Sequence, residues 1–332
     1  MEPATANLSA MDNLCHTLVG LAMGEAGLKR RTPLGNVTLM LAANLPDVDA
    51  LAMFRGRLAG MAFRRGWTHG VLAMSVWPFV LAAVLLGLNR LRHRGAPPAR
   101  YRDLLLLSAL GVWSHPLLDL MNVYGVRLLM PFSDRWFYGD TLFIVDPWLW
   151  LALAAGIVLA QRAQRRESPA PFRPARLALA GVAGYILFMG VLGTFGRTIV
   201  RKELRRQGFE VARMMVAPVP VNPLRRDVVF PIPGGYSTAS LSGLTLYWNE
   251  EEPRHSRAAD PFARRAAATA EGRAFLLWAR FPLFVPGGSE GCPPRRTCIR
   301  DLRYAGQAWA ELAIPDAETL SSAISPRDAE RP

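Results

Sequence analysis

Long apolar runs alternate with short polar segments over the first 196 residues of the chain. A helix needs about 20 mainly apolar residues to cross the hydrocarbon core of a bilayer. Of the six apolar segments, the third, fifth and sixth approach this length, whereas the first two are shorter or carry polar residues. The pattern predicts an all-α polytopic membrane bundle with about four to six membrane segments, some of them short or kinked. The segments cover approximately residues 14–28, 34–52, 67–90, 103–122, 142–160 and 176–196.

The pattern changes after residue 196. A basic stretch at 197–213, which we expect to be helical, leads to short β-rich runs separated by prolines and glycines, as is typical of strands joined by turns. We therefore expect a small strand-rich α+β domain outside the membrane. The β-rich runs are 227–230, 244–248, 275–285 and 299–305. The predicted parts of the chain are a disordered N-terminal extension, a transmembrane helical domain, the strand-rich domain and a flexible tail, at 1–10, 11–196, 197–319 and 320–332.

Composition supports a membrane protein and limits the alternatives. Hydrophobic residues make up 51% of the 332 residues, which excludes an intrinsically disordered chain. The mean hydropathy of +0.15 argues against an ordinary soluble enzyme. The net charge is +13, but the basic residues lie in short clusters between apolar runs, and the sequence shows no basic platform interleaved with aromatic residues. We therefore expect no nucleic acid partner.

The basic residues of the loops predict an orientation. If the six segments alternate, the loops at 28–34, 90–103 and 161–176 hold 13 Lys and Arg residues, and those at 53–66 and 123–141 hold 6. Cytoplasmic loops carry the excess of basic residues in membrane proteins. We therefore expect the first set in the cytoplasm, which puts both termini and the strand-rich domain on the extracytoplasmic side.

Two of the three cysteines, Cys292 and Cys298, lie in a loop rich in proline and glycine. A disulfide between them is expected if this loop is extracytoplasmic, because disulfides persist in oxidising compartments. Unpaired thiols, or a metal site that also uses His255, are the alternatives. Cys15 lies in an apolar segment and is expected to be a small core residue.

Histidines and aspartates interrupt the apolar segments. Ionisable groups at membrane depth are costly and usually functional. In the alternating topology, six of them fall at the extracytoplasmic end of four different segments. This topology rests on the apolar segments and the basic residues alone, so nothing in it requires these six residues to lie on the same side. The six residues are His16, Asp47, Asp49, His69, His115 and Asp119.

The spacing of these residues favours metal binding. His115 and Asp119 are four positions apart and share one face of a helix, which Pro116 is expected to kink or restart. Pro46 disfavours helix before it, so the two aspartates that follow can project inward together. Three imidazoles and three carboxylates suit a divalent metal, preferably zinc, with manganese or iron as alternatives and with one or two ions. For each residue taken singly, the alternative is a packing or capping role.

Three further residues are candidates for catalysis. Asp140 and Asp146 flank an aromatic stretch. Either carboxylate could act as a general base, or could instead cap a helix or pair with Arg135. Arg135 could neutralise an anionic head group.

Four short motifs follow one another along the apolar segments, and they are Met11–Gly20, Ala43–Asp49, Gly66–Gly70 and Ser114–Asp119. In this order and at these separations they resemble the YdjM-like family of inner-membrane metal-dependent hydrolases, and the run Pro131–Trp148 is similar to its longer bacterial members. The resemblance covers residues 11–196. It implies a multi-pass protein of the bacterial inner membrane whose metal ligands are the six histidines and aspartates. Cys15 departs from the family pattern, in which we expect a hydroxyl residue.

These features together predict a membrane-embedded, metal-dependent hydrolase. It would use metal-activated water on a phosphoester or ester of a lipid at the outer face, where a head group can be reached without extracting the lipid. A transporter of metal ions or protons is an alternative, because broken helices and buried ionisable residues also suit ion transport. A non-catalytic scaffold whose helices are joined by the metal is another. Membrane lipid is the expected substrate or environment, and the sequence identifies no protein partner.

Overall fold

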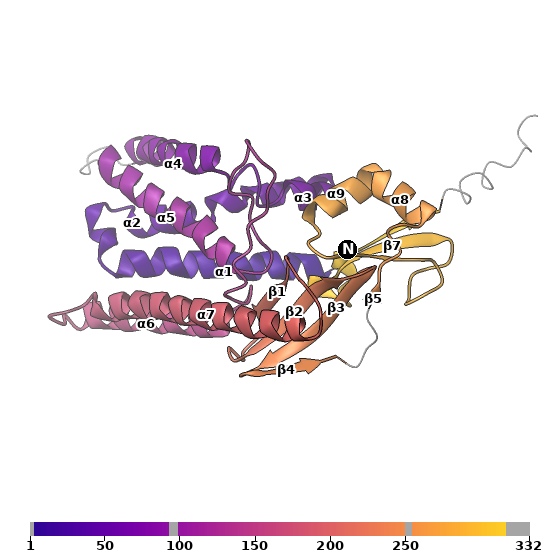
Figure 1. Ribbon diagram of the computed structural model, residues 1–332. Coiled ribbons are helices and arrows are strands. Elements are labelled where there is room, and N and C mark those ends of the chain that lie inside the picture. Colours follow the sequence, from indigo (N-terminus) through magenta and orange to yellow (C-terminus); the bar gives the residue numbers. More distant parts are fainter. Residues whose placement is uncertain (1–2, 93–98, 250–253, 317–332) are drawn as a thin grey trace, which may run out of the picture. The chain divides into compact units, whose positions relative to one another are not determined.

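The computed structural model describes residues 3–92, 99–249 and 254–316 (Figure 1). The chain forms two compact units that are interleaved in the sequence. The bundle unit comprises Met1–Ala52, Phe63–Thr198 and Ala217–Arg226, and the sheet unit comprises Met53–Ala62, Ile199–Val216 and Asp227–Pro332. The predicted tail at 320–332 lies outside the described residues.

The bundle unit is helical, as the apolar pattern predicts. Four segments among the described residues are long and apolar enough to cross a membrane, at Gly35–Arg55, Val71–Leu91, Tyr101–Met121 and Arg173–Arg206. The helices are α1 (Pro3–Glu25), η1 (Leu28–Arg31), α2 (Gly35–Asn44), η2 (Leu45–Arg55), α4 (Val71–Arg92), α5 (Tyr101–Met121), α6 (Pro147–Arg165) and α7 (Arg173–Arg206), whose last turns belong to the sheet unit. Residues 3–10 are helical where the sequence predicts disorder, and the alanines that recur there favour helix.

The two prolines that predict breaks act differently. α2 ends at Asn44, and the chain continues from Leu45 as the 3-10 helix η2, as Pro46 leads us to expect. By contrast, α5 continues through Pro116 without restarting. A proline removes one backbone hydrogen bond, but a membrane helix tolerates this where its neighbours support the freed carbonyl.

Glycines allow α2 to lie close to both α1 and α5. A Cβ atom on Gly111 of α5 would lie 2.5 Å from the Cβ of Ala42 and 3.0 Å from the backbone oxygen of Leu39, both on α2. A Cβ atom on Gly20 of α1 would lie 2.7 Å from the same oxygen. Membrane helices commonly associate through such small residues. The contact at Gly111 comes one turn before His115 and thus sets how close that residue lies to α2.

The sheet unit contains two sheets, as the strand-rich prediction requires. The larger sheet has the order β1, β2, β3, β4, and β5 pairs antiparallel with the start of β3; the smaller sheet is antiparallel, in the order β6, β7, β8. The strands are β1 (Met215–Pro218), β2 (Arg225–Ile232), β3 (Gly235–Ser242), β4 (Thr245–Trp248), β5 (Arg254–His255), β6 (Pro282–Val285), β7 (Arg296–Asp301) and β8 (Glu311–Pro315). The other elements are α3 (Arg57–Phe63), α8 (Pro261–Ala268), α9 (Ala270–Trp278), η3 (Leu302–Tyr304) and η4 (Ala308–Ala310).

Two predicted strands are wrong over part of their length. The run 299–305 is extended only to Asp301, where β7 ends and η3 follows. The run 275–285 is extended only in β6, because residues up to Trp278 belong to α9. Phe275 and Trp278 are three positions apart, so both fall on one face of a helix, and both are fully buried. The Thr269 side chain caps this helix by accepting the backbone N–H of Gly272.

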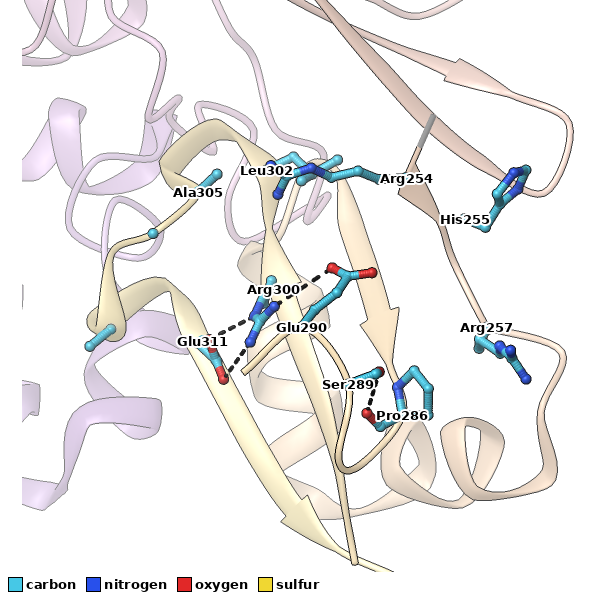
Figure 2. Close-up of a pocket in the computed structure, with 12 residues that line it drawn as sticks. Arg254, His255, Arg257, Pro286, Ser289, Glu290, Arg300, Leu302, Ala305 and Glu311 are labelled. Atoms are coloured by element: carbon cyan, nitrogen blue, oxygen red, sulfur yellow. Dashed lines mark hydrogen bonds and ion pairs between the residues drawn. The ribbon is translucent and has the colours of Figure 1, made fainter. Parts of the chain in front are cut away.

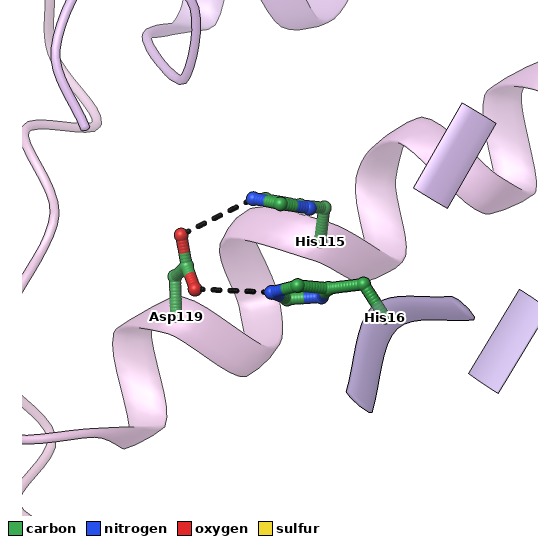
Figure 3. Close-up of side chains that lie close together, drawn as sticks. All are labelled: His16, His115 and Asp119. Atoms are coloured by element: carbon green, nitrogen blue, oxygen red, sulfur yellow. Dashed lines mark ion pairs between the residues drawn. The ribbon is translucent and has the colours of Figure 1, made fainter. Parts of the chain in front are cut away.

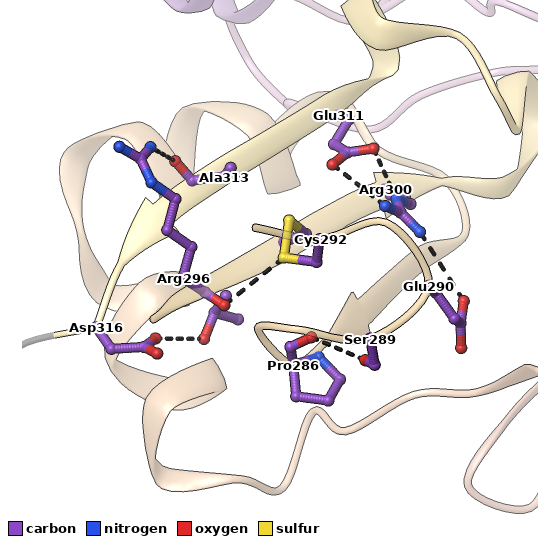
Figure 4. Close-up of a disulfide and its surroundings, with 11 residues drawn as sticks. Pro286, Ser289, Glu290, Cys292, Arg296, Arg300, Glu311, Ala313 and Asp316 are labelled. Carbon is purple, nitrogen blue, oxygen red and sulfur yellow. Dashed lines mark hydrogen bonds and ion pairs between the residues drawn. A yellow bond between two sulfur atoms is a disulfide. The ribbon is translucent and has the colours of Figure 1, made fainter. Parts of the chain in front are cut away.

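Cys292 and Cys298 form a disulfide that joins the loop after β6 to β7 (Figure 4). Both residues are buried. The pairing confirms the predicted disulfide over the two alternatives for these cysteines. Cys15 is partly buried and is not part of a disulfide among the described residues.

Substitutions of two glycines test the close packing of α2 and α5. Gly111→Val should destabilise the protein by about 1–3 kcal/mol, because the new side chain would collide with α2. Gly87→Ala on α4 is the control, since a Cβ there meets nothing within 4 Å, and it should be neutral or slightly stabilising. Thermal denaturation in detergent measures both effects. Equal stability of the two variants would contradict the packing argument.

Candidate metal centre

The bundle unit brings together all six histidines and aspartates that the sequence selects. His16 comes from α1, the two aspartates from η2, His69 from the turn before α4, and His115 and Asp119 from α5. None of the six exposes more than 6% of its surface. Ionisable groups with so little access to water need compensating partners, because an isolated buried charge is very costly.

Four ligand atoms face one another in this cluster. The Nε2 atoms of His69 and His115 are 3.0 Å apart, and they lie 3.2 and 3.4 Å from Oδ2 of Asp119. Oδ1 of Asp47 lies 3.7 Å from each Nε2 atom. In a tetrahedral zinc site with bonds of about 2.0–2.1 Å, neighbouring ligand atoms are about 3.3 Å apart. Five of the six separations among these two nitrogens and two oxygens, the four-atom set, are thus close to this value. Within the set, Asp47, His69 and His115 form one group spaced to hold a metal ion, and His115 and Asp119 belong to a second group with His16.

The other nitrogen of each imidazole is held by an acceptor outside the four-atom set. Nδ1 of His115 donates to the backbone oxygen of Ala43 at 2.6 Å. Nδ1 of His69 lies 2.9 Å from the Thr68 hydroxyl, which donates to Oδ2 of Asp49, and 3.3 Å from that oxygen itself. Such hydrogen bonds fix the tautomer whose Nε2 atom is unprotonated and able to bind metal. Asp49 therefore lies behind His69 rather than in the four-atom set.

The second oxygen of Asp119 has a different environment. Oδ1 lies 3.3 Å from Nε2 of His16 and 3.0 Å from Nη2 of Arg65. The rings of His16 and His115 stack with centroids 3.7 Å apart, so the two imidazoles approach different oxygens of one carboxylate (Figure 3). Neither oxygen accepts a well-aligned hydrogen bond, although the side chain is fully buried. A cation would stabilise a carboxylate in this state.

Arg65 is a buried member of the cluster whose role the sequence analysis missed. Besides its ion pair with Asp119, its guanidinium donates to the side-chain oxygen of Asn122 at 2.9 Å and lies 4.7 Å from the ring centre of Tyr124. Its backbone N–H donates to Asp49 at 2.7 Å. These contacts hold the charge of Arg65 beside the carboxylates.

Arg64 lies on the other side of the aspartates, 3.6 Å from Asp47 and 3.8 Å from Asp49. Burial alone would lower the pKa of its guanidinium, but Tyr124 and the two carboxylates raise the pKa above its usual value, so Arg64 stays charged. In the sequence, both arginines count only as basic residues of a loop. Their place directly before the motif that contains His69 is the signal that could have revealed them.

The three residues predicted to act in catalysis have other surroundings. Asp146 accepts two backbone N–H groups at the start of α6 and the hydroxyl of Tyr185 at 2.9 Å, so it caps a helix. Asp140 lies 3.8 Å from Arg197, and its ion pair among the described residues is with that arginine and not with Arg135. Arg135 is exposed. Among the described residues, none of the three belongs to a group of side chains spaced to hold a metal ion.

Comparisons with known proteins match the amino-terminal, helical part of the chain. The alignment with the Uncharacterized protein YfhP of Bacillus subtilis (strain 168) is 24% identical over 159 residues, which cover 45% of this chain and 46% of YfhP, less than half of that relative's length. No solved structure matches the chain. The model of the family described as YdjM inner membrane protein matches residues 11–195, which include all six clustered residues. Because this match covers more than half of the chain, the protein belongs to the YdjM inner membrane protein family.

Proposed function

We propose that this protein is a membrane-embedded, metal-dependent hydrolase. The observation that carries the proposal is the buried cluster that contains the four-atom set of His69, His115, Asp119 and Asp47, in which the nitrogens lie 3.0–3.7 Å from each other and from the carboxylate oxygens and Asp47, His69 and His115 are spaced to hold a metal ion. When bound, such an ion lowers the pKa of a coordinated water toward ~7 and polarises a phosphoryl or acyl oxygen. The apolar helices and the family match support the membrane setting.

A single ion, preferably zinc, fits the cluster better than two. The two groups of side chains spaced to hold a metal share His115, and the Nδ1 atom of that residue is already bonded to a backbone oxygen. Its one remaining nitrogen can bind only one ion. Arg65 lies beside Oδ1 of Asp119, where a second ion bridged by this carboxylate would sit. Two nitrogens and two oxygens are typical zinc ligands, although manganese and iron accept the same donors.

Two arginines beside the cluster, Arg64, which is partly buried, and Arg65, which is buried, favour a phosphoester as the substrate. Arg64 and Arg65 hold two positive charges next to the four-atom set. Guanidinium groups match phosphate oxygens in geometry and charge, which a neutral ester does not require. These two residues therefore replace the exposed Arg135 as our candidates for binding an anionic group. Because the site lies in a bundle of membrane helices, a membrane lipid is the proposed source of that phosphoester.

We propose that the sheet unit lies on the extracytoplasmic side of the inner membrane. The excess of basic residues in alternate loops supports this orientation. The buried Cys292–Cys298 disulfide supports it independently, because such bonds persist in oxidising compartments.

A metal that only joins the helices is the second candidate, and the near-complete burial of the cluster favours it. Structural metal sites are closed, whereas catalytic sites keep a position for water. Asp47 is the most loosely placed member of the four-atom set, at 3.7 Å from both nitrogens, and it is the most exposed of the four, at 6%. In the hydrolase, we expect water and substrate to approach beside Asp47.

Metal analysis of the purified protein tests the ligand assignment. We expect about one zinc ion per chain and its loss in His115→Gln and Asp119→Asn. Asp49→Asn should keep this stoichiometry but weaken affinity about 10–100-fold, because Asp49 only orients an imidazole. Asp103→Asn is a matched control on the same helix, since Asp103 belongs to a separate ion pair. Two ions per chain, or full binding by Asp119→Asn, would contradict the assignment.

A hydrolysis assay tests the activity. The zinc-loaded protein should cleave a phospholipid in mixed micelles, and a chelator should abolish this reversibly. Asp119→Asn should reduce the rate roughly 100-fold or more, because the metal contributes several kcal/mol to catalysis. Arg135→Gln should stay within about twofold, as expected of an exposed residue. A protein with full zinc content that cleaves no phosphoester or ester would instead support the metal-joined scaffold.

Reporter fusions test the orientation. Alkaline phosphatase is active only outside the cytoplasm, so we expect activity when it is fused after the sheet unit. The same enzyme inserted into the loop at 90–103 should be inactive, because that loop is basic and expected in the cytoplasm. The reverse pattern would overturn the orientation.

A further inference from the structure

A cavity of about 970 Å³ lies within the sheet unit and is bounded by β5 of the larger sheet and by β7 and β8 of the smaller one (Figure 2). Its volume is at the upper end of the range of about 300–1,000 Å³ typical of small-molecule sites. The charged residues that line it are Arg254, His255, Arg257, Glu290, Arg300 and Glu311.

Positive charge exceeds negative charge in this lining. Arg300 donates to both oxygens of Glu311, at 2.7 and 3.3 Å, and lies 3.9 Å from Glu290. Both carboxylates of the lining therefore lie against one guanidinium, as Figure 2 shows. Arg254 and Arg257 contribute two more positive charges to the lining. The described lining is thus net positive, which favours a negatively charged ligand.

Two cross-connections, a local disulfide and a set of long-range hydrogen bonds, hold the walls in place. The Cys292–Cys298 disulfide connects the loop that carries Glu290 to the strand that carries Arg300 (Figure 4). On another wall, Arg57 donates to the backbone oxygens of residues 308, 309 and 311, at 3.4, 2.9 and 3.0 Å. A cavity whose walls are fixed in this way loses little entropy when a ligand binds.

We propose that this cavity binds a small polar molecule that carries a phosphate group. The arginines would bind the oxyanion through charge-assisted hydrogen bonds. The carboxylates of Glu290 and Glu311 would accept hydrogen bonds from hydroxyl groups of the same ligand, and so would the hydroxyl of Ser289, which itself donates to the backbone oxygen of Pro286. No Phe, Tyr or Trp side chain is among the residues that line the described cavity, which favours a polar ligand over a large apolar one.

The anionic group could belong to a lipid head group or to a soluble phosphate, and a titration distinguishes these sources. The full-length protein in neutral detergent, stripped of metal with a chelator so that the bundle unit does not bind phosphate, is titrated with glycerol phosphate and with short-chain phosphatidylglycerol. The test variant is Arg254→Gln/Arg257→Gln. The matched control is Arg264→Gln on α8, which removes an exposed charge outside the cavity. Glycerol serves as the uncharged ligand.

We expect wild type and Arg264→Gln to bind at least one charged probe equally well, and the double variant to bind it roughly tenfold more weakly or worse. Glycerol should not bind. Tighter binding of phosphatidylglycerol would assign a lipid head group, and equal binding of both probes would assign the soluble phosphate. No binding of either probe by the wild type, or equal binding by the double variant, would overturn the proposal. Circular dichroism of the double variant checks that it is folded.

Discussion

The bundle unit depends on the burial of one carboxylate among cationic and imidazole groups. Asp119 has no access to water, and the side chains within 3.4 Å of its oxygens are His16, Arg65, His69 and His115. Removing one partner of a buried ion pair costs about 3–5 kcal/mol, because the other charge is then left uncompensated. These partners come from α1, α5 and the segment between α3 and α4, so the need to compensate one charge fixes where three parts of the chain meet.

The same arrangement explains why tight helix packing and the candidate metal centre occur together. Gly20 and Gly111 let α1 and α5 approach α2 closely, and the backbone oxygen of Ala43 on α2 then holds the ring of His115. An imidazole ligand whose second nitrogen is hydrogen-bonded to a helix is already held in one orientation, so it loses little conformational entropy when a metal binds. The small residues of the bundle therefore contribute to the site as directly as its ionisable residues do.

The sequence predicted the membrane helices, the strand-rich unit, the disulfide and the gathering of six side chains, because each leaves a local signal that spacing or hydropathy can reveal. It missed Arg64 and Arg65, because the residue type alone does not show whether an arginine in a loop points to the cluster or to solvent. It also grouped Asp140 and Asp146 with the catalytic residues, although Asp146 caps α6. Whether an aspartate binds, caps or pairs depends on distant partners such as Tyr185, which no local pattern records.

The contact of Arg57 has a consequence for biogenesis. Arg57 precedes most of the bundle in the chain, yet its guanidinium bonds to a backbone oxygen 254 residues later. During synthesis, Arg57 must wait for the last strand before this backbone partner exists. A ribosome-bound chain that ends after α7 would carry the described helices of the bundle but would lack this partner of Arg57. The sheet unit, whose first segment is synthesised before most of the bundle, is therefore completed only when the carboxy-terminal strands have been made.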